Sequence, residues 1–346
     1  MIEFDPNAAA LSNSGIYGLP HTLAESLVVI IPVPFEATTS YGGGAAAGPA
    51  AILAASRQVD LYDYGTGRPY EAGIYLLAES PQIQDYNRKA KRLAKPIIAR
   101  GGDLTGAASL QRNLKKVNEY GAAVNELVYQ QAKDLIAQGK IVGVIGGDHA
   151  APYGTIAAHA EAFPGLGILH LDAHCDLREA FEGFTWSHAS IMYNVMTRLD
   201  KVARLVQVGI RDFSEQELQM VHAYGGRIVT HFDEALGERK FAGEPWAHLV
   251  EEIIKDLPTQ VYLSFDIDGL DPTLCPSTGT PVPGGLSFPE VVALLAALVR
   301  SGRHIVGFDL NEVAPSPQGG EWDANVGARL LYKMIGYTLL SRKNRC

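Results

Sequence analysis

The chain has 346 residues, of which 47% are hydrophobic and 19% are charged, and its formal net charge is −9. These figures allow one large α/β core, but they argue against nucleic acid or an anionic membrane as a partner, because phosphate binding needs a basic surface. No stretch approaches the roughly 20 apolar residues of a membrane span, and the N-terminus lacks a basic and then apolar targeting segment, so we expect a cytoplasmic protein that acts on small molecules.

Short apolar runs rich in β-branched residues recur along the chain and predict strands. They begin near residues 28, 73, 141, 165, 203, 227, 260 and 304. Amphipathic stretches between most of them predict helices at 117–138, 188–199, 214–223, 243–256 and 288–301. This alternation predicts a single α/β domain over residues 1–346, with a mostly parallel sheet of about eight strands flanked by helices.

Two segments stand apart from this alternation. The stretch "YGGGAAAGPAAILAAS" (41–56) predicts a glycine turn that leads into a helix beginning near Pro49. It lacks the Lys and Ser/Thr of a phosphate-binding loop. Residues 85–116 contain nine Lys or Arg against two Asp. We interpret this region as a solvated helical face or a surface insertion rather than a partner site.

Polar residues gather where several predicted strands end. The motif "GGDH" (146–149) follows one strand, "DAHCD" (172–176) the next, and "SFDIDGLDP" (264–272) and "GFDLNEVAP" (307–315) two more. Residues two apart in an extended segment point to the same side, and parallel strands bring their carboxyl ends to one edge of the sheet. Six side chains are therefore predicted to meet there: His149, Asp172, His174, Asp176, Asp266 and Asp268.

Four carboxylates and two imidazoles in one place call for a cation, because like charges oppose each other's ionisation. Two divalent ions about 3.5 to 4 Å apart, bridged by two carboxylates, would use all six groups. The cysteines, Cys175, Cys275 and Cys346, are too few and too scattered for a thiolate cage or a disulfide framework, and we expect them to be reduced. An oxygen-rich set favours two Mn²⁺ per chain over structural zinc; Ni²⁺, Co²⁺ or Fe²⁺ would also suit these ligand types.

These motifs, with "PVPFEATTSYGGG" (32–44), "EGFTWSHAS" (182–190) and "TGTPVPGGL" (278–286), resemble the ordered signature of the ureohydrolase superfamily of arginases, agmatinases and formiminoglutamases. The resemblance implies an arginase-like fold, a dinuclear manganese centre, cleavage of a guanidino C–N bond, and assembly into trimers or hexamers. It implies that Asp172 and Asp266 bridge the two ions. His149 and Asp176 would then complete one ion's ligands, and the other ion's ligands would be completed by His174 and Asp268.

The same resemblance assigns catalytic roles. Glu312 resembles the glutamate that binds the guanidinium, whose forked donors suit a carboxylate. His188 resembles the family's proton-shuttling histidine, and Asp176 would also accept a hydrogen bond from the bridging hydroxide. His170 shares the parity of Asp172 and lies deeper in the strand, so we expect it to support that ligand.

The loop "LREAFEGFTWSH" (177–188) is expected to face the substrate's tail. It has few of the small polar donors that an arginase uses for an α-amino acid, and it looks closer to agmatinase-type members. We therefore expect hydrolysis of agmatine to putrescine and urea, with Trp186, Phe184 or Phe181 lining an apolar or cation-binding wall. Arg178 keeps a guanidino-acid substrate open, because it could pair with a carboxylate. The sequence also leaves open an arginase, a formiminoglutamase, a one-zinc deacetylase and a catalytically silent metal-binding subunit.

Overall fold

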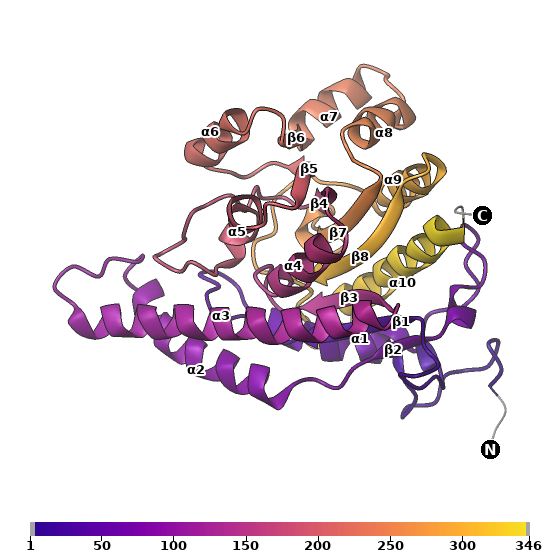
Figure 1. The fold of residues 1–346 in the computed structure, drawn as a ribbon, viewed down its shortest axis with the longest axis horizontal. Helices are drawn as coiled ribbons and strands as arrows, with labels where there is room; N and C mark the ends of the chain where they lie inside the picture. Colours follow the sequence, from indigo (N-terminus) through magenta and orange to yellow (C-terminus); the bar gives the residue numbers. More distant parts are fainter. Residues whose placement is uncertain (1–3, 344–346) are drawn as a thin grey trace.

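A parallel sheet of eight strands runs through the middle of the computed structural model, which describes residues 4–343 (Figure 1). In spatial order its strands are β2 (Ile74–Leu76), β1 (Val28–Val33), β3 (Ile141–Gly146), β8 (His304–Asn311), β7 (Gln260–Asp266), β4 (Leu166–Leu171), β5 (Val202–Ile210) and β6 (Ile228–Phe232). Every neighbouring pair is parallel. All residues of β1, β3 and β4 are buried, as expected for strands covered on both faces. The predicted fold class is confirmed.

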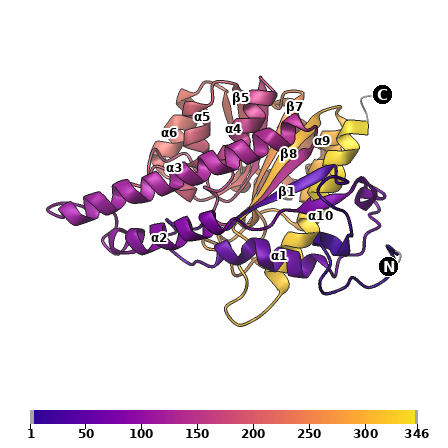
Figure 2. The ribbon, with the colours of Figure 1, turned by 60° about the horizontal axis from the view of Figure 1, so that its bottom comes forward.

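Helices cover both faces of this sheet (Figures 1 and 2). One face packs against α1 (Gly48–Ser56), α8 (Trp246–Lys255), α9 (Phe288–Arg300) and α10 (Trp322–Lys343). The other packs against α3 (Ala108–Ala137), α4 (Tyr153–Ala162) and α5 (Ile191–Arg198). Two further helices, α6 (Glu215–Ala223) and α7 (Asp233–Phe241), contact the strands at the β6 edge.

The helix boundaries follow local signals where such signals exist. Ser287 and Glu290 form a reciprocal capping box at the start of α9, as the sequence indicates. The helix expected from residue 117 begins earlier, at Ala108. Helices α2 (Pro81–Ile98), α4 and α7 are not among the helices predicted from the sequence, although α2 has a clear apolar face with Ile83, Ala90 and Ile97 buried. Helix α4 is hard to recognise from the sequence because it is buried: it lies between α3 and α5 and contacts both, so it has no separate polar face.

The basic region 85–116 lies in a helical hairpin, which we define as α2, the connection 99–107 and α3 (residues 81–137). Its outer part projects past the end of the sheet (Figure 2). All nine basic residues of 85–116 are exposed: Arg88, Lys89, Lys91, Arg92, Lys95, Arg100, Arg112, Lys115 and Lys116.

The structure also bears on the predicted absence of a membrane span and on the predicted reduced state of the cysteines. Within residues 4–343, no helix combines the length and apolar character needed to cross a membrane. Cys175 and Cys275 are free and packed among apolar side chains, and Cys346 lies outside the described residues. Burial raises the pKa of both buried thiols, so neither is a thiolate at neutral pH.

Candidate metal centre

Three strand ends converge at one edge of the sheet. The ends of β3, β7 and β4 lead into the "GGDH", "SFDIDGLDP" and "DAHCD" segments, and β8 lies between β3 and β7. The structure brings together all six residues that the sequence singles out: His149, Asp172, His174, Asp176, Asp266 and Asp268.

His149 lies within a ring of three carboxylates. Its Nδ1 atom is 3.0 Å from Oδ2 of Asp172 and 3.3 Å from Oδ2 of both Asp176 and Asp266. Burial alone would lower the pKa of His149, but these three carboxylates raise it well above its usual value. The four side chains therefore face one small volume with three negative groups and one imidazole.

His174 lies in a second group that shares Asp172 with the first. Its Nδ1 atom is 3.1 Å from Oδ2 of Asp268 and 3.5 Å from Oδ1 of Asp172. The two oxygens of Asp172 thus face different histidines, because Oδ2 faces His149. This is the arrangement that a bridging carboxylate requires.

The turns after the strands fix these carboxylates. Oδ1 of Asp172 accepts a hydrogen bond from the backbone N–H of His174 at 2.6 Å, and Oδ1 of Asp266 accepts from the N–H of Asp268 at 3.0 Å. Asp176 and Glu312 have φ angles of 55° and 62°. Left-handed backbone is uncommon for residues other than glycine, so the local structure here tolerates strain to place these two carboxylates.

Among the described residues, no lysine or arginine balances the charge of the acidic cluster. Asp172, Asp176, Asp266 and Asp268 are at most 5% exposed, and no Lys or Arg among the described residues forms an ion pair with them. Burial and the neighbouring Asp172 raise the pKa of Asp176 to about 7, and burial, Asp268 and Asp172 raise the pKa of Asp266 well above its usual value. Buried carboxylates that resist ionisation are stabilised by a bound cation. Two groups of side chains lie close enough together to hold an ion, and Asp266 lies beside the first of them: His149, His170, Asp172 and Asp176 form one group, and Asp172, His174 and Asp268 form the other. This oxygen-rich set of carboxylates and imidazoles fits a pair of divalent metal ions.

A chain of buried polar groups supports Asp172 from the β5 side. Nε2 of His170 lies 2.8 Å from Oδ2 of Asp172, as its parity predicts. The Gln207 amide nitrogen lies 3.0 Å from Nδ1 of His170 and donates to the Cys175 carbonyl oxygen at 2.8 Å, while Oε1 of Gln207 accepts from the Thr230 hydroxyl. Because a carbonyl only accepts, the Gln207 nitrogen must face Cys175 and His170, which makes Nδ1 of His170 an acceptor and Nε2–H a donor to Asp172.

A second chain supports His149 from the β7 side. Its Nε2 atom lies 2.9 Å from the Ser264 hydroxyl, which in turn donates to Oδ1 of Asp309 at 2.9 Å. Asn311 also donates to that oxygen. Neither Ser264 nor Gln207 is among the site residues predicted from the sequence. Two features of the sequence could have indicated them. Ser264 lies two residues before Asp266 and so points to the same side of the strand, and Gln207 is a polar residue inside an apolar run.

A cavity of about 150 Å³ opens beside the acidic cluster, and it is lined by Ser40, His174, Asp176, Arg178, Phe181, His188, Ala189, Asp212, Glu217 and Thr280. Burial, with the neighbouring His174, lowers the pKa of His188 to about 4. Glu312 lies deeper, 5% exposed, where Oε1 accepts from the backbone N–H of His149 at 3.1 Å. Burial, and then Asp266, raise the pKa of Glu312 well above its usual value.

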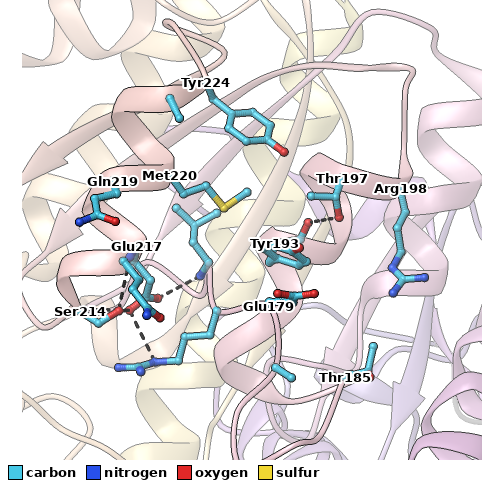
Figure 3. Close-up of a pocket in the computed structure, with 15 residues that line it drawn as sticks. Glu179, Thr185, Tyr193, Thr197, Arg198, Ser214, Glu217, Gln219, Met220 and Tyr224 are labelled. Atoms are coloured by element: carbon cyan, nitrogen blue, oxygen red, sulfur yellow. Dashed lines mark hydrogen bonds and ion pairs between the residues drawn. The ribbon is translucent and has the colours of Figure 1, made fainter.

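The two residues predicted to contact the substrate's tail lie in different places. Arg178 lines the cavity, where its Nε atom is 3.5 Å from Oε2 of Glu217. Trp186 is not among the lining residues; it packs against Gly121 of α3, with its ring 4.9 Å from the Tyr153 ring and 5.1 Å from the guanidinium carbon of Arg198. A wider groove of about 970 Å³ between α5 and α6 shares Arg178 and Glu217 with the cavity (Figure 3).

Comparison with known proteins places this geometry in context. The model of the Arginase family matches residues 26–336. The chain is similar to N(1)-aminopropylagmatine ureohydrolase of Thermus thermophilus, at 34% identity over 90% of both chains. It is also similar to agmatinase of Sodalis glossinidius, at 31% identity over 89% of this chain and 85% of that one. In fold it resembles the crystal structure of agmatine ureohydrolase of Thermoplasma volcanium, with a TM-score of 0.72, 22% identity, and 97% and 98% of the two chains covered.

Proposed function

The chain belongs to the arginase family, and we propose that within this family it hydrolyses agmatine to putrescine and urea. Its relatives make it a metal-dependent hydrolase that acts on guanidino compounds. The proposal is carried by one observation: three strand-end motifs meet in a buried acidic centre beside a small cavity.

Six residues would hold two Mn²⁺ ions in this proposal. Asp172 and Asp266 would lie between the ions, and the remaining ligands would be His149 and Asp176 for one ion and His174 and Asp268 for the other. The opposed directions of the two Asp172 oxygens support its bridging role. When bound, two such ions lower the pKa of a shared water toward neutrality and stabilise the charge that develops on the substrate.

The protein's own groups bind the guanidinium and move its protons. Glu312 would accept hydrogen bonds from the guanidinium; its Oε2 atom has no hydrogen-bond partner among the described residues, whereas Oε1 is held by His149. His188 would move a proton from the attacking water to the leaving nitrogen, which departs as the amine of putrescine. Asp176 borders both the cavity and the acidic cluster, where it would accept a hydrogen bond from that water.

The surroundings of Arg178 favour an amine tail over a carboxylate tail. Its guanidinium is paired with Glu217, and it lies 5.2 Å from the Phe181 ring. Glu217 is itself held by the backbone N–H of Leu177 at 3.0 Å and by Ser214. An acid-tailed substrate would have to compete with this buried carboxylate for Arg178, so the pairing supports agmatine over a guanidino acid.

A longer guanidino polyamine is the second candidate substrate. The relative at 34% identity is named for N(1)-aminopropylagmatine. The groove in Figure 3 adjoins the cavity at Arg178 and Glu217 and contains Glu179, a carboxylate for which the described residues provide no ion pair. An aminopropyl extension would reach from the cavity toward this groove.

A substrate panel tests the proposal. The stripped protein is reloaded separately with Mn²⁺, Ni²⁺ and Zn²⁺, and urea release is measured from agmatine, N(1)-aminopropylagmatine, arginine and guanidinobutyrate, with ammonia release from formiminoglutamate alongside. We expect Mn²⁺-dependent turnover with agmatine preferred. Turnover of another compound with agmatine inert would overturn the substrate, and full metal loading without any turnover would favour a silent metal-binding subunit.

Assembly and location remain predictions. A solution mass measurement tests the expected trimer or hexamer, and a monomer would contradict it. Fractionation of cells tests the cytoplasmic location.

A further inference from the structure

The helical hairpin of residues 81–137 contacts two loops that border the substrate cavity. One is the glycine turn, residues 40–44, which contributes Ser40 to the cavity. The other is the site loop, residues 181–188, which contributes Phe181 and His188. The hairpin itself provides no cavity-lining residue, so any effect on substrate must pass through these loops.

Lys91 of α2 holds the glycine turn through Glu36. The Glu36 side chain is 1% exposed; its Oε1 atom pairs with Lys91, and its Oε2 atom accepts from the backbone N–H groups of Gly44 at 2.9 Å and Ala46 at 2.7 Å. Asn87, one turn earlier in α2, accepts from the backbone N–H of Glu36 at 2.9 Å. One buried carboxylate therefore connects the C-terminal end of the glycine turn to α2.

The glycine turn also contacts the segment around Gly279, which lies next to Glu312. A Cβ on Gly42 would lie 2.6 Å from the carbonyl oxygen of Gly279, so the two backbones are in close contact. A Cβ on Gly279 would lie 3.5 Å from Oε2 of Glu312, and Thr280 lines the cavity. Displacing the turn would therefore disturb the wall next to the carboxylate proposed to bind the guanidinium.

α3 holds the site loop by a separate contact. Oδ1 of Asn118 accepts from the backbone N–H of Thr185 at 3.0 Å, and its Nδ2 atom donates to the carbonyl oxygen of Gly183 at 3.4 Å. A Cβ on Gly183 would lie 2.9 Å from the Leu114 side chain, which shows how closely the loop is seated on α3.

We propose that the hairpin positions the substrate cavity from both sides, with Lys91 and Asn118 as the positioning residues. The kinetic consequence rests on the proposed function, because it is measured with agmatine. The structural consequence does not, because backbone exchange in the two loops is measured without substrate.

The Lys91 arm is tested with four variants of the full-length, Mn²⁺-loaded protein. Lys91→Met removes the ion pair between Lys91 and Glu36, which we call the tie, and leaves the Glu36 carboxylate buried without a cation. The double variant Glu36→Gln/Lys91→Met also removes the tie but leaves no buried negative charge at residue 36. Lys91→Arg keeps the tie. Lys95→Met is the matched control, since Lys95 lies one turn further along α2, is exposed and forms no ion pair among the described residues.

The expected results separate positioning from simple charge balance. In both tie-breaking variants we expect KM for agmatine to rise about tenfold, below the roughly 100-fold loss that a 1 Å misplacement can cause, and hydrogen exchange at residues 38–46 to accelerate. Lys91→Arg and Lys95→Met behave as the parent protein does. Return of KM and of the exchange rate to parental values in the double variant would overturn the inference, because Lys91 would then only neutralise Glu36.

The Asn118 arm gives an independent test. Asn118→Leu is expected to accelerate exchange at residues 181–189 and not at 38–46, whereas Gln111→Ala, at an exposed position of the same helix, changes neither. Unchanged exchange at residues 181–189 in Asn118→Leu would overturn this arm. If agmatine proves inert, the exchange data still decide the inference; if agmatine is turned over and exchange is unaffected, only the inference falls.

Discussion

His149 and His159 are both fully buried, near opposite ends of the same central strands, and their pKa values shift in opposite directions. His149 follows the carboxyl end of β3 and is surrounded by carboxylates, which raise its pKa. His159 lies near the end of α4, against Tyr262 and Gly307 in the amino-terminal parts of β7 and β8, where burial lowers its pKa to about 4.

The difference shows what makes a buried histidine part of a chemical site. Burial disfavours the charged imidazole at both positions, and only the neighbouring groups differ. His159 donates through Nδ1 to the Thr155 carbonyl oxygen, and the Val306 backbone is the other polar group beside its ring. It packs as a neutral aromatic group, whereas His149 lies among carboxylates that favour its charged form.

The largest effect is expected from removing one carboxylate around His149. Asp266→Asn keeps the side chain's volume and its hydrogen bond to Asp268 but removes a charge proposed to bridge two ions. We expect metal-dependent turnover to fall at least about 10³-fold, or ~4 kcal/mol, because metal catalysis supplies several kcal/mol. Metal content per chain should fall as well. The control is Asp271→Asn, in the same motif, where the carboxylate only caps the N–H and hydroxyl of Thr273; equal losses in both variants would contradict a special role for Asp266.

The sequence identifies the carboxyl ends of the strands well because their chemistry is local. Period-two spacing after an apolar run is enough to place Asp172, His174 and Asp176 on one side, and parallel strands bring the separate motifs together. No such spacing marks His159, which packs against Tyr262 and Gly307 in the structure.

The features that sequence reasoning missed depend on contacts between distant segments. Lys91 and Glu36 are 55 residues apart, so neither indicates the other in the sequence. Trp186, one of three aromatic residues predicted near the substrate's tail, packs on α3, where the missing side chain at Gly121 leaves room for it. Gln207 is one polar residue in a buried strand, and its role becomes visible only when β4 and β6 lie on either side of β5.

The next largest effect concerns His159 and pH. Its pKa is about 4 when folded and about 6.5 when unfolded, so the unfolded state binds more protons between these values and stability is lost as pH falls. The loss should reach about 2 kcal/mol at pH 5 and about 3 kcal/mol at pH 4.

His159→Asn isolates this contribution. The variant keeps a donor near the Nδ1 position but cannot titrate, so it should be less stable than the parent at pH 7.5 and approach it as pH falls. Chemical unfolding of the metal-free proteins from pH 7.5 to 5 measures the difference. A stability difference that does not change with pH would contradict a depressed pKa.

Metal addition should act at the His149 end only. At free Mn²⁺ about 100 times Kd, each occupied site should raise the free energy of unfolding by about 2.7 kcal/mol. Thermal unfolding with and without Mn²⁺ measures this, with His159→Asn expected to retain the full increase and Asp266→Asn to lose most of it. An equal increase in all three proteins would mean that Mn²⁺ binds elsewhere.

The smallest effect is expected from the chain of polar groups behind Asp172. Gln207→Leu removes the donor that keeps Nδ1 of His170 an acceptor, so His170 no longer has to donate through Nε2 to Asp172. Loss of such an orienting partner typically lowers metal affinity 10- to 100-fold. Because two hydrogen bonds, through His170, separate Gln207 from Asp172, we expect metal affinity to fall about tenfold, or ~1.4 kcal/mol. Chelator competition measures the affinity. Thr230→Val removes the next hydrogen bond along the chain, to Gln207, and should lower metal affinity less. A larger loss of affinity in Thr230→Val than in Gln207→Leu would contradict the proposal that these hydrogen bonds orient Asp172 through Gln207 and His170.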